Sequence, residues 1–258
     1  IRFDNLAWGL QTWVEDLLAA WVKNFVIETG VKKIVFSGGV AMNVKAMGKL
    51  ASLPEVEDIF IGGSAADESH VISALFMGAR CSGKVRQQDV KRPSNLFLGP
   101  QANKKEEKEA VYNAKQDIHF NVYEKDITDH AVKALVAGKI VARSCGCMEF
   151  GQRSLGNRSI LADPLNLEVK NRINEAIKNR DFWMPFAPIV LDKFADNYLE
   201  NPKKISSPYM TLAFDTTELG YESMRAASHP ADKTVRAQIL TKDANPDVYD
   251  ILERFRCA

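Results

Sequence analysis

The sequence has 258 residues, 46% of them hydrophobic and 26% charged, which is the composition of a folded globular protein with one large or two modest domains. Its 34 lysines and arginines nearly balance 33 aspartates and glutamates, which excludes a disordered chain and an overall polybasic surface for DNA. No apolar run approaches the roughly 18 residues of a membrane-spanning helix, so we expect no membrane partner.

The cysteine count and the first residues bear on the cellular compartment and on whether the sequence is a piece of a longer protein. The four cysteines are too few for a disulfide framework at this size, so we expect a cytoplasmic protein with reduced thiols. The sequence begins Ile1-Arg2-Phe3, without Met or a signal segment, and we therefore interpret it as a piece of a longer protein.

The first part of the chain alternates strands and helices. Apolar residues recur every three or four positions over 4–29, and two short apolar runs further on each end in a glycine pair. The predicted elements are a helix over 4–29, a strand over 33–37, a helix over 42–53, a strand over 58–61 and a helix over 68–80. This pattern is typical of an α/β sheet with sites at its strand ends.

A polar segment over 86–95, ending in Arg-Pro-Ser-Asn, predicts a linker, and the charge-dense segment 103–109 predicts a solvated surface. Helices and strands are predicted again beyond it. The expected helices are 127–137, 167–177 and 247–255, and the expected strands are 139–144, 187–191, 209–214 and 235–240.

The densest group of candidate site residues follows the strand predicted at 139–144. Residues 149–159 hold two glycines, Arg153, Arg158, Ser159 and further small polar side chains. Glycines let a backbone approach a ligand closely, and arginines grip phosphate oxygens with a fixed fork. The alternative is a surface loop with incidental arginines.

A second basic pair, Lys178 and Arg180, stands at the end of a predicted helix. Alone it would be a solvated helix terminus. Residues 143–180, however, carry seven lysines and arginines against four acidic residues. Such a local excess in a neutral protein is what a polyphosphate substrate requires.

Thr234 and Arg236 are two positions apart on a predicted strand, so both would face one side and could bind an anion together. His229 precedes them. An edge strand with polar residues facing solvent explains the same pattern equally well.

Two glycine turns follow the strands of the first part. Gly38, Gly39 and Asn43 stand where backbone N–H groups at a helix start could bind phosphate, although the turn matches no standard nucleotide motif. Asp67, in the second turn, is a candidate metal ligand or a helix N-cap. The histidines form no H-x-x-x-H pair, and Cys145-Gly146-Cys147 lacks the second cysteine pair of a zinc site.

Together these segments resemble the NodU/CmcH family of O-carbamoyltransferases. The match extends in order over almost the whole chain, and six segments are far more specific than one. The matching segments are 37–43 with the Asp67-Glu68 turn, 149–164, 182–188, 207–210 and 234–238.

The resemblance implies an α/β fold with two parts. Residues 1–85 would be the last portion of an ATPase-like domain of the actin and sugar-kinase superfamily, and 86–95 a linker. Residues 96–258 would form an α+β, YrdC-like domain with a twisted mixed sheet. In such a family, the second domain makes carbamoyl-adenylate and pyrophosphate from carbamoyl phosphate and ATP, and the first passes the carbamoyl group to a hydroxyl of a small molecule or glycan.

The resemblance also implies roles for the candidate residues. Carbamoyl phosphate and the ATP phosphates would be held by Arg153, Arg158, Ser159, Lys178, Arg180, His229, Thr234 and Arg236. Gly38, Gly39 and Asn43 would cradle the adenylate. Asp67 would be the one ligand in this chain for a divalent metal, Fe or Mg, with the other ligands in sequence that precedes it.

The sequence departs from the family pattern at several points. Gln152 and Ser154 replace Pro and Ala, Cys147 replaces Arg, and Lys233 replaces the Gly of an Asp-Gly pair. The acidic turn reads Ala-Asp-Glu-Ser where the family has Gly-Asp-Glu-Gly. The basic residues remain in spite of these changes. The changes therefore bear on how the activity is tuned and on which acceptor is chosen.

Two other functions stay open at this point. A non-catalytic nucleotide- or anion-binding regulatory module of the same fold would show affinity without turnover. An RNA-modifying enzyme would need an extended basic stripe with exposed aromatic residues, which the near-neutral charge disfavours. Exposed tryptophans at 8, 13 and 21 would drive self-association, with a homodimer as its simplest form.

Overall fold

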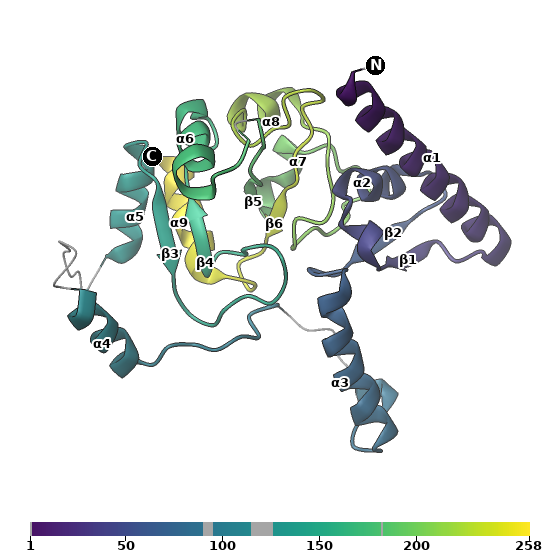
Figure 1. Cartoon of the computed structure of the whole chain (residues 1–258), viewed down its shortest axis with the longest axis horizontal. Coiled ribbons are helices and arrows are strands. Elements are labelled where there is room, and N and C mark those ends of the chain that lie inside the picture. The colour runs from purple at the N-terminus through teal and green to yellow at the C-terminus, as the bar shows by residue number, and fades with distance from the viewer. Residues whose placement is uncertain (1, 90–94, 115–125, 182) are drawn as a thin grey trace.

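A computed structural model shows a mixed α/β protein (Figure 1), and it describes residues 2–89, 95–114, 126–181 and 183–258. Phe182 and residues 90–94 of the predicted linker lie outside the described residues. None of the described helices is long and apolar enough to cross a membrane. All four cysteines are free thiols.

The first part of the chain forms the predicted order of elements. They are α1 (Phe3–Thr29), β1 (Lys33–Phe36), a 3-10 turn (Gly39–Met42), α2 (Val44–Ser52), β2 (Asp58–Ile61), a 3-10 turn (Asp67–Ser69) and α3 (His70–Cys81). β1 and β2 pair in parallel, with Ile34 opposite Ile59. Their carboxyl ends therefore lie side by side, as the strand–glycine–helix pattern predicts.

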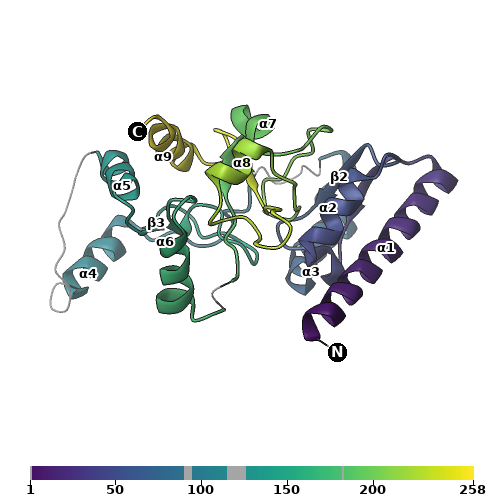
Figure 2. The same ribbon diagram turned by 90° about the horizontal axis from the view of Figure 1, so that it is seen from above.

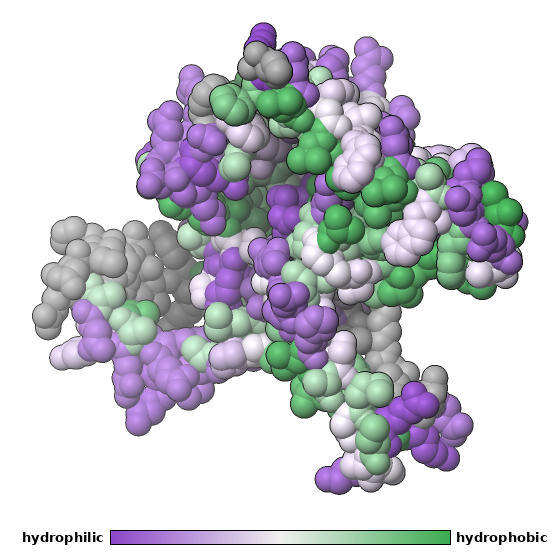
Figure 3. All heavy atoms as spheres, turned by 45° about the vertical axis from the view of Figure 1, so that its right-hand side comes forward, coloured by the Kyte–Doolittle hydropathy of each residue, from purple (hydrophilic) through white to green (hydrophobic). Residues whose placement is uncertain are grey.

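α1 lies on the outside of this layer, with α2 beneath it (Figure 2). Only Leu18, Val22 and Val26 of α1 are buried, and they form its inner stripe. Trp8, Trp13 and Trp21 of the same helix are each about 60% exposed. Apolar side chains are also in open view on the α3 lobe (Figure 3), whose residues include no buried one.

These exposed apolar faces predict self-association. We expect the light-scattering mass of this chain to rise with concentration, because a large apolar patch gains free energy when it leaves water. A glutamate substitution at Trp13, which is 61% exposed on α1, should reverse the rise. A mass that stays monomeric at high concentration would contradict the prediction.

The charge-dense segment is helical, where the sequence predicted only a solvated surface. α4 (Lys104–Ala114) buries none of its residues. Asn103 starts it, because its side-chain oxygen accepts the N–H groups of Lys105 and Glu106 while Glu106 accepts the N–H of Asn103. This reciprocal capping explains how a solvated segment still forms a helix.

The second part of the chain contains further short elements. They are α5 (Ile127–Val136), β3 (Val141–Ser144), β4 (Arg158–Leu161), α6 (Leu167–Arg172) continued by a π-helical turn (Ile173–Lys178), β5 (Ile189–Leu191), a 3-10 turn (Asp192–Phe194), α7 (Ala195–Tyr198), α8 (Glu218–Ser223), β6 (Gln238–Leu240) and α9 (Pro246–Cys257). A 3-10 turn over Gln87–Asp89 precedes them.

Two strand predictions in this part differ from the structure. Residues 158–161, where no strand was predicted, form β4, which pairs antiparallel with β3. Residues 209–214, expected to be a strand, form turns with one isolated bridge between Phe214 and Val235. The described strands of 96–258 form two separate pairs, β3–β4 and β5–β6, in place of the single twisted mixed sheet expected there, and β1–β2 form a third pair in the first part.

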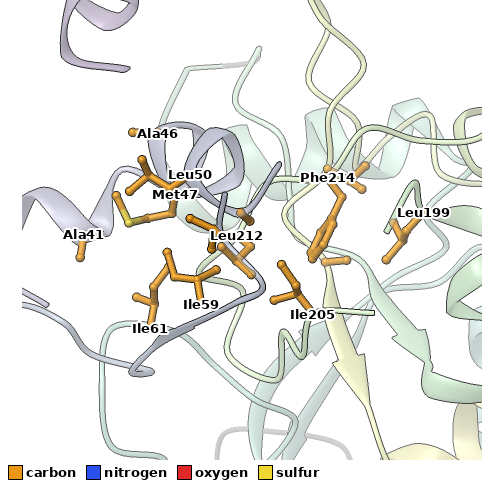
Figure 4. Close-up of a cluster of buried hydrophobic side chains, with 14 of the residues drawn as sticks. Ala41, Ala46, Met47, Leu50, Ile59, Ile61, Leu199, Ile205, Leu212 and Phe214 are labelled. Carbon is orange, nitrogen blue, oxygen red and sulfur yellow. The ribbon is translucent and has the colours of Figure 1, made fainter. Parts of the chain in front are cut away.

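The main hydrophobic core joins the two parts of the chain. Met47 and Leu50 of α2 and Ile59 of β2 lie in one cluster with Leu212 and Phe214 (Figure 4). The division into domains at 86–95 remains a prediction, and this shared core means that any two such units pack through a dry apolar contact.

A half-buried lysine reinforces this contact. The Lys203 ammonium group donates to the carbonyl oxygens of Ala51 at 2.8 Å and Val56 at 2.7 Å, and to that of Leu53. All three of its donors are therefore used at the carboxyl end of α2. Burial lowers the pKa of Lys203.

Candidate functional site: a cavity with three unpaired arginines

One large cavity, with a volume of about 1050 Å³, lies in the second part of the chain. Its walls come from β4, α6 and its π turn, β5 and α9. Half of the twelve predicted site residues line it. They are Arg153, Arg158, Ser159, Lys178, Arg180 and Arg236. Three segments that are distant in the sequence therefore contribute to one space.

Arg153, Arg180 and Arg236 give the cavity its positive charge. Within the described part of the chain, each keeps one buried nitrogen without a hydrogen-bond partner: Nε of Arg153 and of Arg236, and Nη2 of Arg180. Burial lowers the pKa of all three. The pKa of Arg236 falls to about 10 because its burial is joined by repulsion from Arg153 and Arg180. Buried donors without partners, held near one another against repulsion, are the arrangement that the binding of an anion would require.

Arg180 is fixed in place by neighbours that the sequence did not indicate. Its Nε donates to Oδ1 of Asn174 at 2.7 Å, and its guanidinium group lies 4.3 Å from the centre of the Phe186 ring. Asn174 is fully buried and donates in turn to the carbonyl of Met184 at 3.0 Å. An arginine held in this way loses little side-chain entropy when it binds an anion. Lys178, on the same π turn, is exposed.

The loop that carries Arg153 is built around Glu149. One carboxylate oxygen of Glu149 accepts three backbone N–H groups, from Leu155 at 3.1 Å, Asn157 at 2.7 Å and Arg158 at 2.9 Å. Burial opposes its ionisation, but these N–H donors keep its pKa below the usual value. Glu149 thus stays ionised and organises the loop, a role that its place in a glycine-rich segment did not reveal.

Arg158 and Ser159 also hold this loop. The Arg158 guanidinium donates to the carbonyl oxygens of Cys145 at 2.8 Å and Gly146 at 3.0 Å. The Ser159 hydroxyl accepts the N–H of Gly156 at 2.9 Å. The structure therefore gives these two residues contacts that shape the cavity wall, where the sequence predicted contacts with substrate.

Thr234 and His229 are not among the residues that line the cavity, and the strand predicted over 235–240 is shorter in the structure. β6 begins only at Gln238, and the Thr234 hydroxyl donates to Oδ1 of Asp232 at 2.8 Å. Nδ1 of His229 is 3.1 Å from the same oxygen. Burial opposes the charge on Asp232, but hydrogen bonds from Lys45 and Thr234 lower its pKa to about 2.

The first glycine turn meets the second at the ends of β1 and β2. Gly38, with a φ of +110°, donates its N–H to the carbonyl of Ala65 at 2.9 Å. Asn43 caps α2 by accepting the N–H of Ala46 at 3.1 Å, and its amide also exchanges hydrogen bonds with Gln11. Gly39 is exposed. In this arrangement, the Asn43 side chain stabilises the helix start.

Asp67 does not form a metal site by itself. Its side chain is fully exposed, and its only ion-pair neighbour in the described part of the chain is Nε2 of His70 at 3.9 Å. The described residues hold no group of three or more His, Cys, Asp or Glu that could bind a metal. Asp67 and His70 are too few ligands for a resident metal ion, so ligands from elsewhere would be required. The turn does adjoin the arginine loop, because a Cβ on Gly151 would stand 3.1 Å from the carbonyl oxygen of Gly63.

Comparison with known proteins indicates the family of the chain. Residues 132–258 match the family model described as "Carbamoyltransferase C-terminus". An uncharacterised protein of Methanocaldococcus jannaschii is 36% identical over 246 residues, which is 94% of this chain and 45% of that protein. Nodulation protein NolO of Bradyrhizobium diazoefficiens is 30% identical over 250 residues, 96% of this chain and 45% of NolO.

A named carbamoyltransferase matches about half of the chain. The 3'-hydroxymethylcephem-O-carbamoyltransferase of Amycolatopsis lactamdurans is 32% identical over 128 residues, 49% of this chain and 23% of that enzyme. The chain thus spans less than half the length of these relatives. The family match and the nodulation and cephem relatives agree with the resemblance noted in the sequence. The chain belongs to the NodU/CmcH family of carbamoyltransferases.

Proposed function

We propose that this chain carries the adenylate-forming half of an ATP-dependent O-carbamoyltransferase. Carbamoyl phosphate and ATP would give carbamoyl-adenylate in the cavity, and the carbamoyl group would then pass to a hydroxyl of a small molecule or glycan. The observation that carries the proposal is the convergence of Arg153, Arg180 and Arg236, with unpartnered buried donors, on one cavity. Its volume is sufficient for a nucleotide.

The chemistry explains why such a cavity needs cations. Water first cleaves carbamoyl phosphate at the bond between its carbonyl carbon and the phosphate oxygen, which yields carbamate and phosphate. A carbamate oxygen then attacks the α-phosphorus of ATP, and the bond from that phosphorus to the bridging oxygen breaks, releasing pyrophosphate. Two anions must approach each other and a third must leave, so fixed positive charge and positioning supply most of the catalysis.

The contacts divide the work among the residues. Arg153, Arg180 and Arg236 would bind phosphate oxygens, and Lys178 would meet them at the exposed edge of the cavity. In the later step, the acceptor hydroxyl attacks the carbonyl carbon of the adenylate and AMP leaves. The glycine turn at Gly38 would bind that adenylate, as the family resemblance implies. Asp67 remains a proposed ligand of a divalent cation, and no step is assigned to that ion.

Release of pyrophosphate from ATP tests the proposal. We expect release to require carbamoyl phosphate and to fall at least about tenfold in Arg153→Ala, because a buried charged donor is lost. Arg225→Ala is the matched control, since the Arg225 side chain is 55% exposed and lies outside the cavity wall. Arg225→Ala should release pyrophosphate at the wild-type rate.

Two outcomes would contradict the proposal. One is release that ignores carbamoyl phosphate or survives Arg153→Ala. The other is binding of ATP, seen by calorimetry, with no release under any condition. The second result would favour the non-catalytic nucleotide- or anion-binding module.

A further inference from the structure

Lys45, on α2, makes an ion pair that reaches from the first part of the chain to the second. Its ammonium group hydrogen-bonds Oδ2 of Asp232, and the two side chains are only 33% and 21% exposed. Oδ1 of Asp232 accepts both the hydroxyl and the N–H of Thr234, at 2.8 and 3.1 Å. A single carboxylate therefore joins α2 to the turn that leads to Arg236.

This turn is closed on itself. The N–H of His229 donates to the carbonyl of Thr234 at 2.8 Å, and the N–H of Lys233 donates to the carbonyl of His229 at 2.9 Å. Lys233 has a φ of +60° and its ammonium group lies 4.5 Å from the centre of the Tyr221 ring. A non-glycine residue in this conformation is strained, so the turn depends on its other contacts to keep its shape.

α2 also holds the segment next to Arg236 through the backbone. The carbonyl of Val44 accepts the N–H of Ala213 at 3.0 Å. Phe214 then exchanges two backbone hydrogen bonds with Val235, both 2.9 Å. The route from α2 through Asp232 ends at Thr234, and the route through Ala213 ends at Val235, the residue before Arg236.

We propose that Lys45 is a positioning residue for the anion cavity: its ion pair with Asp232 fixes the 229–235 turn and thereby aims Arg236 at the bound anion. Lys45 does not line the cavity. There is a physical reason for such a positioning contact. Like charge repels Arg236 from Arg153 and Arg180. Contacts outside the cavity must therefore hold the backbone segment of Arg236 in position. The inference rests on the anion site of the proposed function.

Trp8 supplies a reporter for this link. The Lys45 ammonium group lies 5.2 Å from the centre of the Trp8 ring, in the geometry of a cation–π contact. Trp8 stands on α1 and does not line the cavity. An anion that draws Arg236 inward should shift Lys45 through Asp232 and so change the surroundings of the Trp8 ring.

The experiment measures pyrophosphate affinity by calorimetry in variants of two lysines on the same helix. We expect Lys45→Met to weaken pyrophosphate binding about fivefold to tenfold, a typical size for coupling through a positioning contact. Lys45→Arg, which keeps the charge, should restore affinity to within about twofold of wild type. Lys49→Met is the matched control, because Lys49 pairs with Asp16 of α1 at 2.7 Å and not with the turn. It should bind pyrophosphate as wild type does.

A spectroscopic measurement separates positioning from general loss of stability. In protein labelled with 5-fluorotryptophan, pyrophosphate should shift the ¹⁹F signal of Trp8 in the wild type and leave it unmoved in Lys45→Met. Trp13, which is 61% exposed on the same helix, serves as the internal reference. If Lys45→Met does not fold, Asp232→Asn tests the same link, because it keeps an oxygen for Thr234 and removes the charge.

The outcomes are distinct. Equal affinities of Lys45→Met, Lys49→Met and wild type, with Arg153→Ala unable to bind, would overturn the positioning role and leave the anion site intact. Wild-type protein that does not bind pyrophosphate would overturn the anion site and, with it, this inference. An equal loss of affinity in Lys45→Met and Lys49→Met would show a general effect of α2 and overturn the specific link.

Discussion

Replacement of Arg236 by Met should stabilise the free protein and weaken its binding of pyrophosphate. Burial and the charges of Arg153 and Arg180 depress the pKa of Arg236 to about 10. For a base, a folded-state pKa below the unfolded value means that its charge costs stability at neutral pH, and this cost disappears only as the pH rises above 10. We expect the free energy of unfolding at pH 7 to rise by about 1–3 kcal/mol, because an apolar side chain replaces a buried unpaired charge.

The same substitution should raise the Kd for pyrophosphate about a hundredfold, since a charge-assisted contact and the central cation of the cluster are lost. Urea unfolding gives the first quantity and calorimetry the second. Stability and binding thus move in opposite directions, as at sites where function requires a strained arrangement.

Arg158→Met is the control for this prediction. Arg158 lines the same cavity, but its guanidinium group is satisfied by the carbonyls of Cys145 and Gly146. Its loss should therefore lower the free energy of unfolding, because two carbonyl oxygens lose their donors. A drop in stability in Arg236→Met as well would show that the three arginines are compensated in the free protein, against the prediction.

Gly48→Ala should destabilise the protein by about 2–3 kcal/mol, although alanine is the better helix former. Gly48 lies inside α2, and a Cβ there would stand 2.3 Å from the carbonyl oxygen of Ala213. The contacting atom belongs to the backbone, so α2 would have to move away from residues 209–214. That movement would open the core that joins the two parts of the chain.

Gly78→Ala is the matched control, because Gly78 also lies within a helix, α3, and a Cβ there meets nothing within 4 Å. It should stabilise the protein by up to about 1 kcal/mol. Urea unfolding measures both variants. Equal changes in the two would show that α2 does not need the close approach at Gly48. Because α2 also carries Lys45, we expect Gly48→Ala to weaken pyrophosphate binding too.

Local pattern accounted for much of the fold. The spacing of apolar residues predicted α1 almost to its ends, and the two strand–glycine–helix units of the first part are present. These elements are set by interactions within a few residues, namely helical periodicity, capping and turn glycines. The charge excess over 143–180 likewise indicated a basic site, since Arg153, Arg158, Lys178 and Arg180 line one cavity.

What the sequence by itself did not determine depends on contacts between distant segments. Residues 209–214 have the composition of a strand, yet they pack against α2 and β2 as turns, because burial there substitutes for strand pairing. β4 forms because residues 158–161 meet β3 across a loop organised by Glu149.

The candidate site was also determined partly by the sequence and partly by the tertiary structure. Residue type identified the arginines, but only the tertiary structure decided that Arg158 holds backbone carbonyls while Arg236 keeps a buried donor without a partner. It also decided that the Thr234 hydroxyl donates to the Asp232 carboxylate, and that Lys45 of α2 forms an ion pair with the same carboxylate. A side chain's chemical type is fixed by the sequence, whereas its partners are fixed by which distant segments the packed core brings beside it.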